Sequence, residues 1–472
     1  MELTNESSQS VITCRNSQGI ELTANLLRIK RYSVVFEVYN PYSILQLSEV
    51  LSDFRIMASR RLLYHGKAVV SNLLNTGIVL VCEATLEDGW VEVDFLSTVS
   101  GTGDLPAQFG AFMQEWKSAS KVHNPFKLVV ADMVNMFSGV QHWMTGVDVG
   151  IRTTVTRSRE DLEKEIFSGI QTQVIGEVLP SWERLEDVAK EVGEAEVSLH
   201  KAYLRRELHP IVLCSPFIFR TYTKPLGYAG DYEMVNMMLR NPYEGSSTFA
   251  KLLNFALLHT EPVVAHRNRI DYLVETLRSE TRKRVRKGKT RVFNLACGPA
   301  VEVGRFLRNH EESDLTEFDL LDFNSETLDY TRGRLIEERM SAGRETPLRF
   351  FQRSVHQILR AAAQGDTDEE LNDYDIVYCA GLFDYLSQRV CQRLVDLFCK
   401  MAKPGGLVIV TNVATSNPRR ACMEYLMEWN LIHRNEEEMN DLIPAGLPVK
   451  RTEVKADVTG VNLFLEIELA DA

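Results

Sequence analysis

The spacing of apolar and polar residues changes along the chain. Over residues 1 to about 100, runs such as GIELTANLLRIKRYSVVFEVYN alternate apolar and polar positions between Gly, Asn and Asp turns, which is typical of antiparallel strands. From 101 to about 205 the apolar residues recur at helical spacing. From 291 to 472 short apolar runs alternate with helical stretches, which predicts a parallel sheet with helices on both faces. We therefore expect a small β-barrel, a helical region and an α/β core.

The stretch between the helical region and the core, residues 206–290, has the least regular pattern. Its segment RTYTKPLGYAGDYEMVNMMLRNPYEG mixes Tyr, Gly, Pro, Lys and Asp. Gly227 and Gly230 give the backbone freedom there, so this composition favours a lid that closes over a pocket. The next predicted helix, EPVVAHRNRIDYLVETLRSE, carries three cationic or titratable residues that are suited to holding an acidic ligand group: His266, Arg267 and Arg269. The basic run over 281–291 is expected to be a solvated linker.

Candidate chemistry gathers in RVFNLACGPAVEVGR (291–305) and FDLLDFN (318–324). Each begins as an apolar strand, and the first ends in small residues that let backbone approach a ligand closely. The helix after it offers unpaired N–H groups. Asp322 closes the second strand, 24 residues after Gly298, where a carboxylate can hold a ribose diol. Three kinds of turn share this pattern: one that binds S-adenosylmethionine, one that binds NAD, and one that binds no ligand.

FNLACGPA resembles the LDLGCGPG motif of class I S-adenosylmethionine (SAM) dependent methyltransferases. The chain departs from it with Asn294, Ala296 and Ala300. Three later segments resemble the family's third, fourth and fifth strands: FFQRSVHQ, YDIVYCAGLFDYL and MAKPGGLVIVTNV. The resemblance implies a Rossmann-like methyltransferase sheet with a terminal antiparallel hairpin, here turning at Thr459–Gly460, and SAM as cofactor. It implies these cofactor-binding residues: Asn294, Ala296, Gly298, Pro299, Ala300, Asp322, Phe323, Ser354, Val355, Ala380 and Gly381.

Composition narrows the function classes. The hydrophobic share of 44% and the charged share of 25% are those of a soluble globular protein, and no apolar stretch is long enough for a membrane span. The net charge of −12 argues against a nucleic-acid partner. The eight cysteines form no CxxC pair and no Cys/His cluster, so we expect no metal site, and a cytoplasmic location.

The N-terminal barrel resembles a PilZ domain, a family whose members often bind cyclic di-GMP. That family uses an RxxxR segment and a [DN]xSxxG segment. Here Arg28 and Arg31 have RxxR spacing, and NLLNTG (72–77) carries Leu74 in place of Ser. We expect a PilZ-like barrel over 1–100 that has lost the nucleotide. A docking or dimerisation module is the alternative, and the helical region over 101–205 is long enough to carry homodimer contacts.

The lid, the HRNR helix and MEYLMEWNLIHR together resemble a bacterial group of methyltransferases that includes 3-hydroxy fatty acid methyl ester synthases, which make quorum-sensing signals. A fatty acid carboxylate is already ionised at neutral pH, so the enzyme needs no strong base. Residues 417–439 are predicted as a helix in the substrate wall. Four residues are expected to orient the acid: Tyr228, Arg267, His433 and Arg434. An alcohol or amine acceptor would need a base, for which the candidates are His259, His266 and His433.

A second class of function stays open at this point. A SAM-binding core joined to a PilZ-like barrel can also serve as a sensor or scaffold without turnover. The departures at Asn294, Ala296 and Ala300 keep that alternative open.

Overall fold

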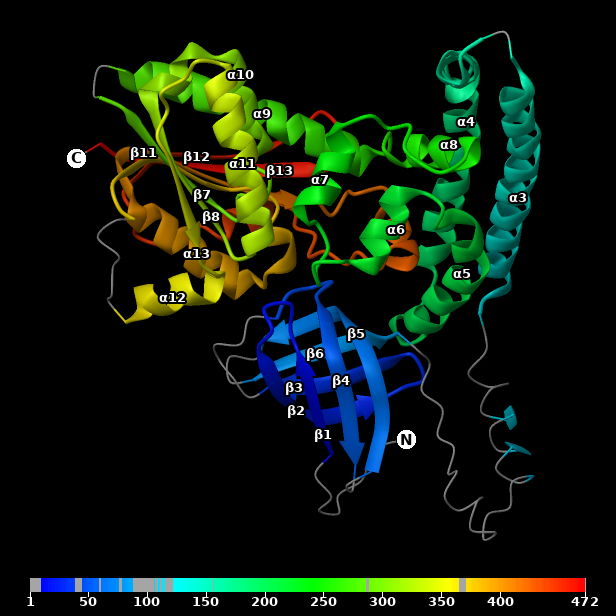
Figure 1. Ribbon diagram of the computed structural model, residues 1–472. Coiled ribbons are helices and arrows are strands. Elements are labelled where there is room, and N and C mark those ends of the chain that lie inside the picture. Colours follow the sequence, from blue (N-terminus) through cyan, green and yellow to red (C-terminus); the bar gives the residue numbers. More distant parts are fainter. Residues whose placement is uncertain are drawn as a thin grey trace.

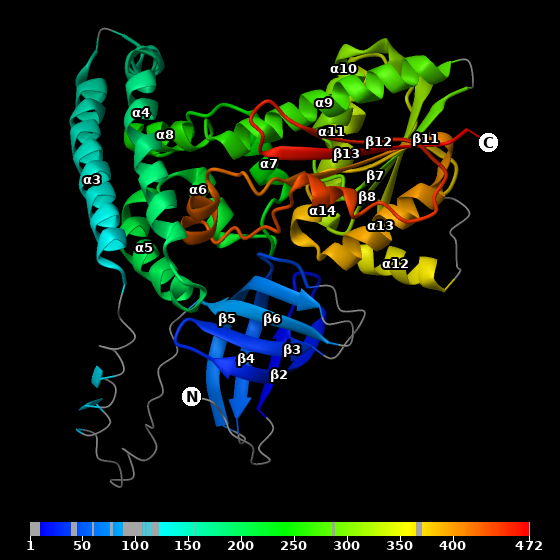
Figure 2. The ribbon, with the colours of Figure 1, turned by 180° about the vertical axis from the view of Figure 1, so that it is seen from behind.

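The computed structural model describes residues 10–38, 45–58, 61–75, 79–87, 106, 109–110, 113–114, 122–155, 157–285, 288–364 and 371–471. A barrel lies at one end, helices flank it, and a mixed sheet forms the largest unit (Figures 1 and 2). Two expected elements, the strand over 90–97 and most of the helix over 105–120, lie outside the described residues.

The barrel is a closed antiparallel sheet with the strand order β1-β2-β3-β6-β5-β4. Its strands are β1 (Val11–Arg15), β2 (Glu21–Ile29), β3 (Ser33–Val38), β4 (Val50–Ala58), β5 (Arg61–Asn75) and β6 (Leu80–Leu86). Alternating residues such as Ile12, Val34 and Phe36 point inward and are fully buried. The expected small barrel is therefore confirmed, although Gly77 of the nucleotide motif lies outside the described residues.

Helices connect the barrel to the sheet. They are α3 (Asn124–Thr153), α4 (Arg159–Lys190), α5 (Val197–Val212), α6 (Pro216–Thr223), α7 (Tyr232–Leu239), α8 (Thr248–Leu257) and α9 (Glu261–Arg284). The long helices α3 and α4 form a hairpin, in which the buried rings of Phe137 and Trp182 lie 5.8 Å apart. Within the described ranges no helix combines the length and apolar character needed to cross a bilayer.

The large sheet has the strand order β12-β13-β11-β10-β7-β8-β9. Its strands are β7 (Thr290–Leu295), β8 (Thr316–Asp322), β9 (Leu348–Gln352), β10 (Tyr374–Cys379), β11 (Ala402–Val413), β12 (Val449–Ala456) and β13 (Asn462–Leu469). The first five of these are parallel, and β13 runs antiparallel to both β11 and β12. This is the α/β sheet with a terminal hairpin that the resemblance implied, so the expected fold class is confirmed.

Helices cover both faces of this sheet. They are α10 (Val301–Asn309), α11 (Ser325–Ser341), α12 (Val355–Ala363), α13 (Gln388–Met401) and the short α14 (Glu436–Asn440). Val292 of β7 belongs to the core shared with α9, α10 and α11, whereas its neighbour Phe293 belongs to the core shared with α12 and α13. Strand β7 is therefore buried on both sides, which explains its continuous apolar run.

The chain order along the sheet reverses at β7. From β7 the chain proceeds to β8 on one side and later to β10 on the other. In open α/β sheets such a switch point leaves a crevice at the carboxyl ends of the two strands, and ligands bind there. The segments after Leu295 and Cys379 meet at this crevice.

Two expectations about local structure were wrong. Residues 417–439 are not one helix: a single π-helical turn (Cys422–Leu426) is followed by irregular chain, because Glu428 adopts a left-handed φ of 53°. Glu186 of α4 holds this segment by accepting hydrogen bonds from the N–H groups of Ala421 and Cys422. The basic run over 281–291 is not wholly a linker, since α9 extends through its first residues to Arg284.

Candidate active site

The turn after β7 has an unusual backbone. Ala296, Gly298 and Ala300 all have left-handed φ values, 54°, 50° and 45°. Such a conformation costs an alanine about 1–2 kcal/mol, so this part of the fold holds two alanines in places suited to glycine. No atom outside the turn lies within 4 Å of the point where a Cβ of Gly298 would stand. The turn therefore presents bare backbone to open space.

Asp322 ties this turn to the end of β8. Its Oδ2 accepts a hydrogen bond from the N–H of Gly298 (3.1 Å), and its Oδ1 accepts one from the N–H of Asn324 (3.0 Å). Burial raises the pKa of Asp322, and these backbone donors oppose the rise. Each carboxylate oxygen keeps a second lone pair that can accept from a ligand hydroxyl. The carboxylate is therefore positioned before any ligand arrives.

A buried polar network lies beneath the turn. Oε1 of Glu302 accepts hydrogen bonds from Nδ2 of Asn294 (3.1 Å) and from the hydroxyl of Tyr378 (2.8 Å). Burial raises the pKa of Glu302. An aspartate at position 294 would place a second carboxylate against Glu302, so this network explains why the chain carries Asn there.

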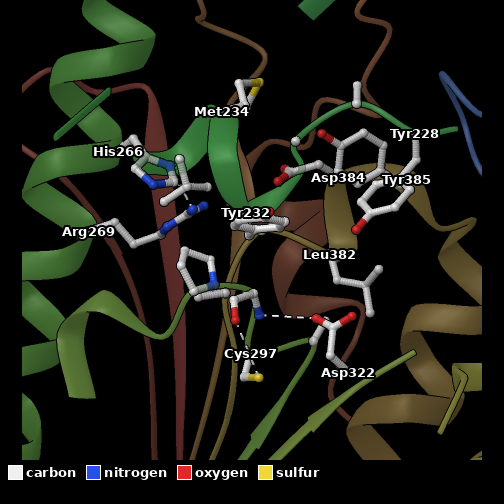
Figure 3. A pocket seen from close by; sticks show the side chains of 18 of the residues that line it. Tyr228, Tyr232, Met234, His266, Arg269, Cys297, Asp322, Leu382, Asp384 and Tyr385 are labelled. Atoms are coloured by element: carbon white, nitrogen blue, oxygen red, sulfur yellow. Dashed lines mark hydrogen bonds between the residues drawn. The ribbon is translucent and has the colours of Figure 1, made fainter. Parts of the chain in front are cut away.

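A cavity opens above the turn at the switch point (Figure 3). Its lining includes ten of the predicted cofactor-binding residues: Asn294, Ala296, Gly298, Pro299, Ala300, Asp322, Phe323, Val355, Ala380 and Gly381. The remaining one, Ser354, is not among the lining residues. Its hydroxyl accepts from the N–H of Gln357 and caps α12, so its part in the site stays a prediction.

Arg269 of α9 lies across the cavity from Asp322 (Figure 3). Its guanidinium is within hydrogen-bond distance of Nδ1 of His266 (2.8 Å), and it lies 3.1 Å from the point where a Cβ of Gly381 would stand. Arg269 is only 9% exposed, and among the described residues no ion pair within 4 Å is found for it. The buried carboxylates of Asp384 and Glu302 act on its charge from farther away. A buried arginine that faces a cavity and has no carboxylate within 4 Å is suited to hold an anionic ligand group.

The same contact defines the state of His266. A guanidinium can only donate, so Nδ1 of His266 accepts and its proton lies on Nε2. Burial and the neighbouring Arg269 hold the pKa of His266 well below its usual value. His266 is therefore a neutral donor toward the cavity and not a free base.

Within the segment expected as a lid (220–245), residues 224–231 connect α6 to α7, and Tyr228, Ala229 and Gly230 line the cavity. Below, "the lid" denotes residues 224–231. The ring of Tyr228 packs against that of Phe323 with 5.1 Å between centroids. The pKa of the Tyr228 hydroxyl is raised, mainly by burial and to a lesser extent by the negative charge of Asp322. Gly227 and Gly230 have φ values of 84° and 79°, which allow the lid its sharp turns. The structure thus brings Tyr228 into the cavity, beside Asp322.

The other residues expected to orient the acceptor do not line the cavity. Arg267 donates to the carbonyls of Met238 and Leu258 (2.9 Å each). Arg434 is buried and donates to the carbonyls of Phe383 (2.8 Å) and Leu386 (2.7 Å). These arginines therefore satisfy backbone groups.

Two of the histidines proposed as bases, His259 and His433, also lie outside the cavity lining. Burial lowers the pKa of His433 to about 4, and its Nε2 lies 3.2 Å from the side-chain nitrogen of Asn417. His259 lies with Nδ1 at 2.7 Å from the carbonyl of Phe255. Neither is among the lining residues, so His266 is the one candidate histidine at the cavity.

The cavity lining also includes Asp384 and Tyr385, which were not among the predicted site residues, and Trp429 from the expected substrate wall over 417–439. Nε1 of Trp429 donates to the hydroxyl of Tyr385 (2.8 Å), which leaves the phenol proton free to bond elsewhere. Asp384 also lines the cavity; its Oδ1 accepts from the N–H of Val413 (2.6 Å), and burial raises its pKa. Apolar side chains also line the cavity: Met234, Val235, Met238, Met423, Leu431 and Val461.

A usable signal for two of these residues was present in the sequence. Asp384 and Tyr385 follow β10 at the carboxyl edge of the sheet, where ligands bind. Trp429 lies within 417–439, the segment expected to form part of the substrate wall, but it lines the cavity from irregular chain and not from a helix. In the described part of the chain, no three His, Cys, Asp or Glu side chains gather as metal ligands.

No protein-family model matches this chain, and no curated protein does. A solved structure from Bordetella parapertussis, described as a possible exported protein, is 15% identical over 54% of this chain and 86% of its own, with a TM-score of 0.40. Magnesium protoporphyrin IX methyltransferase from Synechocystis PCC 6803, with bound S-adenosylhomocysteine (SAH), is 12% identical over 44% and 84%, with a TM-score of 0.32. An O-methyltransferase family protein from Burkholderia thailandensis is 15% identical over 67% and 100%, with a TM-score of 0.33. Likeness at this level says nothing of activity.

Proposed function

We propose that the protein is a SAM-dependent methyltransferase that acts on a small molecule. The observation that carries this proposal is the cavity at the switch point, with the carboxylate of Asp322 on one side and the buried guanidinium of Arg269 across from it. SAM has a ribose diol and a methionine carboxylate, which are chemically complementary to these two groups. When bound, SAM supplies an electrophilic methyl group.

The residues that line the cavity match three parts of SAM: the ribose, the adenine and the methionine carboxylate. Asp322 accepts from the ribose hydroxyls, as its second lone pairs allow. Phe323 and Val355 flank the adenine, with Tyr228 closing over this end. Arg269 holds the methionine carboxylate, because it faces the cavity and no carboxylate of the described chain lies within 4 Å of its guanidinium.

The acceptor site favours an acid with an apolar chain. The cavity histidine is a donor, so no histidine base faces the cavity. A carboxylate acceptor needs none, since it is already ionised at neutral pH. Tyr385 can donate its phenol proton to one carboxylate oxygen and so orient the other. With the methionine-rich wall, this supports a fatty acid, and the sequence resemblance narrows it to a 3-hydroxy fatty acid that gives a methyl ester signal.

Asp384 supports a second candidate. A buried carboxylate with a raised pKa at the cavity can serve as a base for an alcohol or amine acceptor. In that case Asp384→Asn would abolish methyl transfer while SAM binding persists. With an acid acceptor, the same variant would still turn over.

The test has two stages. Calorimetric titration with SAM first measures binding, with Asp322→Ala as the variant expected to lose it. Methyl-labelled SAM is then incubated with a panel of 3-hydroxy acids, alcohols and amines, and the products are identified by mass. Label that stays in SAM across the whole panel, despite binding, would favour a sensor over an enzyme.

A further inference from the structure

The amino-terminal barrel forms part of the cavity wall. Gln18, in the turn between β1 and β2, and Gln46, just before β4, both line the cavity, and both are half-buried. They are the barrel residues that reach it within the described chain. The barrel therefore contributes two residues with neutral amide side chains to the cavity wall, and each amide has a donor and an acceptor.

One buried carboxylate holds both barrel segments that carry these glutamines. Glu49 is 1% exposed. Its Oε1 accepts from the N–H (2.9 Å) and the hydroxyl (2.6 Å) of Ser17, and its Oε2 accepts from the N–H of Gln46 (2.9 Å). Ser17 directly precedes Gln18. The two oxygens of Glu49 thus fix the backbone at both glutamines.

The barrel is also fastened to the segments that line the acceptor end. The hydroxyl of Ser48 donates to the carbonyl of Asn430 (2.9 Å) and accepts from its N–H (2.5 Å). The N–H of Val50 donates to the carbonyl of Gly227 in the lid (2.7 Å). Since Asn430 follows Trp429, the barrel and the acceptor wall share one hydrogen-bonded framework.

We propose that Gln18 and Gln46 are specificity-determining residues for the acceptor: their amides bind a hydroxyl group that the acceptor carries. Glu49 is a positioning residue, since it acts through the backbone of both segments. A neutral amide pair distinguishes a hydroxylated acceptor from its unsubstituted analogue, because removing the hydroxyl leaves the amides unpaired. This assignment rests on the proposed function and names the part of the acceptor that the barrel recognises.

The test compares 3-hydroxydodecanoate with dodecanoate, each titrated calorimetrically into the full-length protein saturated with SAH. The wild-type protein should bind the hydroxylated acid more tightly by at least about two- to tenfold, the range of one neutral hydrogen bond. In the double variant Gln18→Ala/Gln46→Ala this ratio should fall to about one, while the affinity for SAH stays unchanged. Gln141→Ala, an exposed glutamine of α3, is the matched control and should keep the ratio.

Glu49→Gln tests the positioning role. Its new amide nitrogen must face the N–H of Gln46 or the donors of Ser17, so one segment is released although both glutamines remain. The ratio should fall without a change in SAH affinity. The double alanine variant replaces two half-buried side chains, so the test does not depend on Glu49→Gln folding.

The outcomes separate this inference from the proposed function. A ratio that the double variant preserves overturns the role of the glutamines, as does a wild-type protein that binds the two acids equally. If the protein binds SAH but neither acid, the proposal of an acid acceptor and the role of the glutamines are both overturned, while the proposed cofactor site is retained. Failure of SAH to bind overturns the proposed function itself.

Discussion

The N–H of Gly298 and Oδ2 of Asp322 are joined by a 3.1 Å hydrogen bond, which holds the turn after β7 against the end of β8. Asp322→Ala removes both this bond and the acceptor for the ribose diol. Hydrogen bonds to a charged group contribute about 1.5–3 kcal/mol, so SAH affinity should fall roughly ten- to hundredfold by calorimetry. Asp329→Ala, an exposed carboxylate of α11, should leave the affinity unchanged. An Asp322→Ala protein that binds SAH within twofold of wild type would contradict the ribose assignment.

Arg269→Ala should separate the two ends of the ligand. If Arg269 holds the methionine carboxylate, the variant loses affinity for SAH by about tenfold or more, because a charge-assisted contact is removed. It should bind 5′-methylthioadenosine, which lacks the amino acid part, as well as the wild type does. Asp322→Ala should weaken both ligands, since both carry the ribose.

Arg267→Ala is the control on the same helix. Arg267 donates to the carbonyls of Met238 and Leu258, so its loss should lower thermal stability and leave both ligand affinities unchanged. Equal loss of SAH and 5′-methylthioadenosine binding in Arg269→Ala would show that Arg269 acts on the fold and not on the carboxylate.

Local patterns were sufficient to predict the barrel, the parallel sheet and the turn at Gly298. Each rests on residues close together in sequence: alternation within β2, a buried run in β7, and small residues followed by an acid in β8. The terminal hairpin was likewise visible, since β12 and β13 flank a turn at Gly460, whose φ is 71°.

The acceptor end could not be predicted in this way, because it is assembled from distant segments. Tyr385 and Trp429 are 44 positions apart in the sequence and are joined by a hydrogen bond. Gln46 of the barrel lines the same cavity. The predicted helix over 417–439 failed for a related reason. Its apolar residues do have helical spacing, yet the left-handed Glu428 ends the helical turn that Glu186 caps at its first N–H groups.

Asn294→Asp should destabilise the protein although it restores the residue of the family motif. The new carboxylate would stand where Nδ2 of Asn294 now donates to Glu302 (3.1 Å), so a buried hydrogen bond becomes a repulsion. We expect a loss of about 1–3 kcal/mol in the free energy of unfolding, measured by urea titration. The double variant Asn294→Asp/Glu302→Gln should recover most of it, because the glutamine amide can donate to the new carboxylate. A single variant as stable as wild type would argue against the network.

Glu302→Gln should make stability less dependent on pH. Burial raises the pKa of Glu302 in the fold, whereas in the unfolded chain a glutamate ionises with a pKa of about 4.3. The folded state therefore keeps its proton to higher pH, and this group's contribution to stability falls as pH rises from about 4 through the folded pKa. Glutamine does not ionise, so the gain in melting temperature over wild type should be smallest near pH 4 and grow toward pH 8.

The control for that series is Glu337→Gln, an exposed carboxylate of α11. Its melting temperature should follow the wild-type curve at every pH. Parallel curves for wild type and Glu302→Gln would mean that Glu302 titrates alike in both states.

Tyr232→Phe should loosen the lid. The hydroxyl of Tyr232 donates to Oε1 of Glu326 (2.9 Å), and its ring stacks on that of Tyr330 with 4.6 Å between centroids, so the start of α7 is held to α11. Phenylalanine keeps the stacking and removes the hydrogen bond, which contributes about 0.5–1.5 kcal/mol or somewhat more because its acceptor is charged.

The expected result is a faster release of SAH and greater amide hydrogen exchange over residues 224–231, with little change in global stability. Glu326→Gln should act in the same direction. The double variant should add little to either single change, because both remove one interaction. Additive effects on the SAH release rate would show that Tyr232 and Glu326 act on the lid independently. The ion pair between Arg220, before the lid, and Asp231, its last residue, would then be the next contact to test, since its atoms lie 2.9 Å apart.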